Sequence, residues 1–161
     1  MDTSITRKTS RTFHVKDPGS AATHFIGMIM AAVGMGPLLA RAIRHPEPVY
    51  AVSMLLFMCS MVLLYAASTC YHTFDLSPHA NKILKKTDHM MISILIAGTY
   101  TPVCLIALKP STGTALCLAV WAMALGGILL KAFWVYCPKW ISSVLYIGMG
   151  WLCVFALGQL W

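Results

Sequence analysis

Hydrophobic residues are gathered along the chain into five long runs separated by short polar segments. Each run approaches the ~20 residues that an α-helix needs to cross a bilayer, and none contains Asp, Glu, Lys or Arg. Strands are excluded, because an open sheet cannot satisfy its backbone in lipid and no run alternates with period two. The pattern predicts an all-α fold, a polytopic transmembrane helical bundle, preceded by a cytoplasmic tail over residues 1–20. The predicted spans are 21–40, 49–71, 89–108, 112–130 and 141–161.

Composition supports a membrane protein. Hydrophobic residues make up 58% of the 161-residue chain and charged residues only 11%, against about 25% in soluble domains. The formal net charge of +7 alone would suit a nucleic-acid partner, but all twelve Lys and Arg residues lie outside the hydrophobic runs. No basic stripe interleaved with aromatic residues occurs, so nucleic-acid binding is excluded and the lipid bilayer is the predicted partner.

The positions of the basic residues predict the orientation. Short loops and tails that carry most of the Lys and Arg residues remain in the cytoplasm. Five spans place nine basic residues on the side of the N-terminus and three on the other side. We therefore predict a multi-pass protein of the cell membrane, with a cytoplasmic N-terminus and with Trp161 outside. The nine are Arg7, Lys8, Arg11, Lys16, Lys82, Lys85, Lys86, Lys131 and Lys139, and the three are Arg41, Arg44 and Lys109.

Polar and ionisable side chains gather where three spans reach the predicted cytoplasmic side. Ser68 and His72 stand four residues apart at the end of the second span, which places them on one face of a helix. Asp88 and His89 open the third span, and His24 lies near the start of the first. Such groups are costly at the edge of a membrane, so they indicate a functional site.

Structural explanations exist for each of these residues taken alone. Asp88 would lie in the first turn of a helix, where a carboxylate complements the helix dipole. The Ser68 hydroxyl would bond back to the carbonyl of Leu64, as hydroxyls in apolar helices often do. The histidines would hold their polar tips in the lipid headgroups.

Three segments resemble the hemolysin III family, which belongs to the progestin and adipoQ receptor superfamily. They are residues 17–24 (DPGSAATH), residues 68–72 (Ser-x-x-x-His), and Lys86-Thr87-Asp88 followed by Gly98-Thr99-Tyr100-Thr101-Pro102. The resemblance covers nearly the whole chain beyond the tail. It implies a seven-helix architecture with a cytoplasmic N-terminus, of which this chain contains five spans and is apparently truncated after the fifth.

By this resemblance the site would hold zinc near the cytoplasmic side. His72 would be a metal ligand, Asp88 would hold the metal-bound water, and Ser68 would support the site by hydrogen bonding, which makes Asp88 and Ser68 the catalytic candidates. The family takes two further ligands from a His-x-x-x-His pair in its seventh helix, and this chain contains no such pair. A homo-oligomer or the missing C-terminal helices would complete the site, and His24, His89 or Cys70 are the next candidate ligands.

Two functions are consistent with these observations. In the first, the chain is a membrane protein of the hemolysin III type that keeps a remnant of a metal site and is non-catalytic, either receptor-like or membrane-perturbing. In the second, the architecture completed by the missing helices is a zinc-dependent membrane hydrolase of a lipid amide or ester, because zinc lowers the pKa of bound water toward neutrality.

Overall fold

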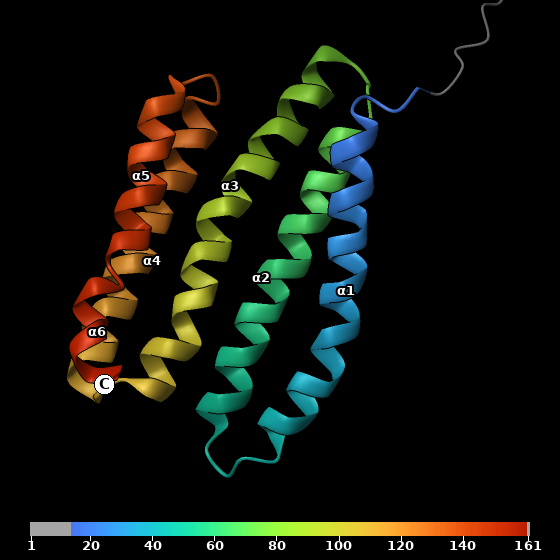
Figure 1. Cartoon of the computed structure of the whole chain (residues 1–161). Coiled ribbons are helices and arrows are strands. Elements are labelled where there is room, and N and C mark those ends of the chain that lie inside the picture. The colour runs from blue at the N-terminus through green and yellow to red at the C-terminus, as the bar shows by residue number, and fades with distance from the viewer. Residues whose placement is uncertain (1–13, 161) are drawn as a thin grey trace, which may run out of the picture.

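The computed structural model describes residues 14–160, and Figure 1 shows long helices joined by short turns. No strand occurs over this range, which confirms the all-α prediction. The elements are α1 (Pro18–Ile43), α2 (Pro48–Thr73), α3 (Pro78–Pro102), the π-helical segment η1 (Val103–Ala107), α4 (Pro110–Phe133), α5 (Lys139–Trp151) and α6 (Val154–Leu160).

Five helical stretches in the described part of the chain are long and apolar enough to cross a membrane. They are Pro18–Ile43, Pro48–Thr73, Pro78–Ala107, Pro110–Phe133 and Lys139–Gly158, the last of which contains the break between α5 and α6. Large apolar side chains such as Met30, Leu118 and Phe155 remain exposed on these helices. Exposed apolar surface on this scale is expected where lipid surrounds the protein, so the chain is a multi-pass membrane protein.

Proline sets the start of four helices. α1, α2, α3 and α4 each have Pro at their first position, where the fixed φ suits a helix and the missing N–H is not needed. Two of these helices also have a side-chain cap. Asp17 accepts from the backbone N–H of Ser20, and Ser77 accepts from that of Ala80 at 3.2 Å. These signals keep the connections between the membrane helices short.

α3 begins at Pro78, well before the predicted span boundary at His89. The cap at Ser77 and three helix-favouring lysines, Lys82, Lys85 and Lys86, extend the helix beyond its apolar part. Asp88 therefore lies in the interior of α3, and the expectation that it occupies the first turn is wrong. Hydrophobicity located the part of α3 that suits lipid, whereas the cap determines where the helix begins.

The other end of α3 changes its helical geometry at Pro102. Proline has no N–H to donate to the carbonyl of Gly98, and the chain continues from Pro102 as the π-helical turn η1. Leu108 then leaves the helix with an extended backbone before α4 begins.

The helices pack mainly against their neighbours in sequence: α1 on α2, α2 on α3 and α3 on α4, while α5 contacts both α3 and α4. Small residues allow close approach at these contacts. The backbone of Gly98 lies against Ser60 of α2, and that of Gly127 lies against Ser93 of α3. A buried cluster between α3, α4 and α5 completes the interior and contains Ala97, Val120, Ala124 and Met149.

One end of the bundle carries most of the described basic residues. α1, α3 and α5 begin there, while α2 and α4 end there, at the top of Figure 1. We call it the lysine-rich end, and its basic residues are Lys16, Lys82, Lys85, Lys86, Lys131 and Lys139. Its predicted location in the cytoplasm stays a prediction.

Candidate functional site

The start of α1 is fastened to the end of α2 at the lysine-rich end. The Asp17 N–H donates to the His72 carbonyl at 2.8 Å, and the Lys16 N–H donates to the Thr73 carbonyl at 3.2 Å. The Lys16 ammonium also lies 3.7 Å from the centroid of the Tyr71 ring, a cation–π contact. These contacts fix where α1 begins relative to the last turn of α2.

The same connection joins the side chains of His72 and Asp17. His72 Nδ1 lies 3.2 Å from Asp17 Oδ2. The Asp17 carboxylate also accepts from the Ser20 hydroxyl at 2.7 Å, in its role as the cap of α1. The hydrogen bond from the Ser20 side chain lowers the pKa of Asp17, and the nearby His72 acts in the same direction. A carboxylate thus holds the residue that the sequence predicts as a metal ligand.

Ser68 bonds across the helix contact. Its Oγ lies 2.6 Å from His24 Nδ1 of α1, and Ser68 is almost fully buried. The Ser68 hydroxyl thus contacts His24 and not the Leu64 carbonyl, which was the structural explanation expected for it from the sequence. The ring of His24 also packs edge-on to that of His72, with centroids 5.4 Å apart. Ser68, His24, His72 and Asp17 form one polar cluster, which we call the His72 cluster.

Asp88 has a different partner. Its Oδ2 lies 3.5 Å from Nδ1 of the adjacent His89, and the residue is 9% exposed. The same His89 nitrogen donates to the Lys85 carbonyl at 2.8 Å, and the Tyr146 hydroxyl of α5 donates to the His89 carbonyl at 3.1 Å. Among the described residues, no hydrogen bond or ion pair joins Asp88 to Ser68 or His72.

The structure thus brings Ser68 and His72 together with His24, which the sequence also placed at this end, and leaves Asp88 in a separate pair on α3. Asp17 completes the His72 cluster and was not predicted as a site residue. Its position before Pro18 marks it as a helix cap at the same end of the bundle, and this signal could have found it. Cys70 lines an apolar hollow between α1 and α2.

The donors of the described chain do not by themselves fit a catalytic zinc ion. Such a site uses three protein ligands and one open position. Over residues 14–160, no group of three His, Cys, Asp or Glu side chains lies in an arrangement that could hold a metal ion. Zinc binding therefore needs donors beyond the His72 cluster as described.

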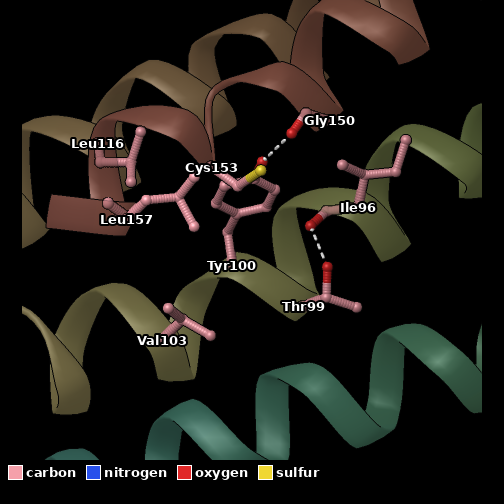
Figure 2. Close-up of a pocket in the computed structure, with 9 residues that line it drawn as sticks. Ile96, Thr99, Tyr100, Val103, Leu116, Gly150, Cys153 and Leu157 are labelled. Carbon is pink, nitrogen blue, oxygen red and sulfur yellow. Dashed lines mark hydrogen bonds between the residues drawn. The ribbon is translucent and has the colours of Figure 1, made fainter. Parts of the chain in front are cut away.

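A second, apolar pocket lies away from the His72 cluster (Figure 2). Its volume is about 460 Å³, and it lies beside Tyr100 between α3, α4 and the break that joins α5 to α6. The Tyr100 hydroxyl donates to the carbonyls of Met149 at 2.9 Å and Gly150 at 2.7 Å. This pocket contains none of the predicted site residues.

Comparison with known proteins gives consistent relatives. The haemolysin-III related family matches residues 13–161. The chain is 36% identical over 161 residues to "Hemolysin-3" of Bacillus cereus, an alignment that covers 100% of this chain and 72% of that protein. It is 37% identical over 150 residues to "Hemolysin-3 homolog" of Bacillus subtilis (strain 168), covering 92% of this chain and 70% of that protein. No solved structure matches the chain significantly. The chain belongs to the haemolysin-III related family of membrane proteins.

Proposed function

We propose that this chain is a non-catalytic, membrane-perturbing protein of the haemolysin III type, which keeps in His72 one ligand of a metal site. The observation that carries the proposal is the pairing of the two main site residues. His72 is held by Asp17 at 3.2 Å, while Asp88 is held by His89 at 3.5 Å. Residues that a hydrolytic centre would share are thus engaged in separate contacts on α2 and α3.

Two further features support an action on the bilayer itself. The spanning helices expose large apolar side chains around the bundle, including Met30, Leu118 and Phe155. One relative, 36% identical to this chain, is named a hemolysin. We extend to this chain the membrane perturbation that this name indicates.

The test is dye leakage from liposomes that contain the purified chain. The chain is expected to release dye in proportion to its amount, and His72→Ala is expected to release it equally well, because no chemical step is involved. Release of fatty acid from a lipid amide or ester should stay at the level of empty liposomes. Fatty acid release that requires both zinc and His72 would overturn the proposal.

The second candidate is a zinc-dependent membrane hydrolase of a lipid amide or ester. The observation that favours it is the approach of two imidazoles, His24 and His72, whose ring centroids lie 5.4 Å apart, because histidine nitrogens are common zinc ligands. Ser68 hydrogen-bonds to His24 at 2.6 Å and would support such a site. The hydrolase candidate predicts that Ser68→Ala reduces fatty acid release, whereas membrane perturbation predicts no release to reduce.

A further inference from the structure

A cavity with several lysines in its wall lies at the lysine-rich end between α3, α4 and α5, separate from the His72 cluster. Its volume is about 580 Å³. Three lysines from three parts of the chain line it: Lys85 of α3, Lys131 in the last turn of α4, and Lys139 at the start of α5. None of its described lining residues is Asp or Glu. The lining side chains therefore carry a net positive charge, and the nearest recorded carboxylate is that of Asp88, which lies behind the lining residue His89 at 3.5 Å.

Lys131 is the central feature, because it is a buried cation. The residue is only 3% exposed, and its ammonium donates to Cys137 Sγ at 3.0 Å and to the Ser142 hydroxyl. These contacts satisfy hydrogen bonds without supplying a carboxylate. Among the described residues, two ion pairs involve a carboxylate, Asp17 with His72 and Asp88 with His89, and neither includes Lys131. A buried charge is costly unless an opposite charge compensates it, so this arrangement favours a bound anion.

The lowered pKa of the Cys137 thiol is consistent with the same positive environment. Burial alone raises the pKa of this thiol, but hydrogen bonds from Ser142 and Lys131, together with the Lys131 charge, outweigh burial and lower it. Surroundings that stabilise a negative charge on sulfur also stabilise an anionic oxygen in the adjoining space. α5 adds to this field, because it begins at Lys139 without a side-chain cap and directs the positive end of its dipole toward the same end.

We propose that this cavity binds a phosphate group, with Lys131 as the buried cation and with Lys85 and Lys139 nearer the surface. The hydroxyls of Ser142 and Ser143 supply further polar groups along its wall. Because the cavity lies where membrane helices end, the phosphate has two sources, the headgroup of an anionic phospholipid or free inorganic phosphate. The site is independent of the function proposed for the His72 cluster.

The first experiment tests the lipid source. The full chain is placed in nanodiscs of phosphatidylcholine that contain some phosphatidylglycerol, and native mass spectrometry counts the phosphatidylglycerol that remains bound after extraction. Lys131→Met should reduce retention by about tenfold or more, the effect of losing a charged hydrogen-bond donor. Lys82→Met removes the same charge from an exposed residue of α3 that does not line the cavity, and it should change retention by less than about twofold.

The second experiment tests free phosphate. The chain in phosphatidylcholine alone is titrated with inorganic phosphate or with chloride at equal ionic strength, and the thermal unfolding midpoint is measured. A rise specific to phosphate and absent in Lys131→Met identifies inorganic phosphate as the source. Retention of phosphatidylglycerol without such a rise identifies the lipid headgroup.

Two further variants keep the result interpretable. If Lys131→Met does not fold, the double variant Lys85→Gln with Lys139→Gln keeps the buried lysine and should itself weaken binding. Cys137→Ser should retain binding, because the Cys137 thiol lies beside the proposed phosphate and is not itself the negative charge that compensates Lys131. Equal losses in the Lys131 and Lys82 variants, loss of binding in Cys137→Ser, or no preference for phosphate in either experiment would overturn the proposal.

Discussion

At the scale of single residues, the Ser68–His24 hydrogen bond joins α1 to α2 inside the His72 cluster, beside the contact between His72 and the α1 cap Asp17. Ser68→Ala leaves the half-buried His24 ring without this partner. We expect a loss of about 1–2 kcal/mol in the free energy of unfolding, measured in detergent. Ser143→Ala is the matched control, because that hydroxyl is exposed and bonds its own helix, and it should cost less than about 0.5 kcal/mol. An equal effect of the two changes would contradict a role for the contact.

Asp17 gives the site a dependence on pH. Its pKa is lowered in the folded protein, first by the Ser20 side-chain hydrogen bond and also by His72. A carboxylate whose folded pKa is lowered stabilises the fold above its unfolded pKa, about 3.9, and loses this contribution as the pH falls through the lower folded pKa. The wild-type chain should therefore be more stable than Asp17→Asn at neutral pH, and the difference should disappear in acid. A difference that stays constant from neutral to acid pH would exclude this ionisation as its source.

Sequence reasoning predicted part of the His72 cluster. The spacing of Ser68 and His72 placed both side chains on one face of α2, because local helix geometry decides this. The cap signal at Asp17 places that residue at the same end of the bundle, but the contacts of His24 with Ser68 and of Asp17 with His72 depend on how α1 packs on α2, which no local pattern specifies. Asp88 was grouped with them because the third span was expected to begin beside it on the same side of the membrane, and because the family resemblance assigns it to the site. In the structure it lies in the interior of α3 and pairs with His89.

At the scale of helices, close packing of α4 depends on one of two adjacent glycines. A methyl group at Gly127 would collide with Ser93 of α3 and Leu145 of α5, whereas one at Gly126 would meet no neighbouring atom. Gly127→Ala should destabilise the bundle by about 1–3 kcal/mol, the usual cost of overpacking. Gly126→Ala should be neutral or stabilise by up to about 1 kcal/mol, because alanine favours a helix. Thermal unfolding of both variants tests this, and the reverse order would show that the α3–α4 contact is misplaced.

The helices were predictable where hydrophobicity and turn residues agree. The prolines that open α2 and α4, Pro48 and Pro110, mark starts that lie within a few residues of the predicted spans. The start of α3 was missed, because Lys82, Lys85 and Lys86 lower the hydrophobicity of a segment that is nevertheless helical. The break between α5 and α6 was also missed, because residues 141–161 form one continuous apolar run in the sequence.

At the scale of the whole molecule, the distribution of basic residues predicts how the protein sits in its membrane. A reporter inserted between α2 and α3, after Phe74, should behave as cytoplasmic, and one fused after Trp161 as external. The reason is the excess of Lys and Arg on the side of the N-terminus, nine residues against three. Exchanged reporter signals would refute the predicted orientation.

The zinc content of the purified chain most directly tests whether its site is only part of a metal centre. His72 lies beside Asp17 and His24, but over residues 14–160 no three such side chains are arranged so that they could hold a metal ion, and a tight zinc site needs three protein ligands. Elemental analysis after dialysis against a mild chelator should find far less than one zinc ion per chain, with no further loss in His72→Ala. One zinc ion per chain that resists the chelator and disappears in His72→Ala would contradict this interpretation and favour the hydrolase.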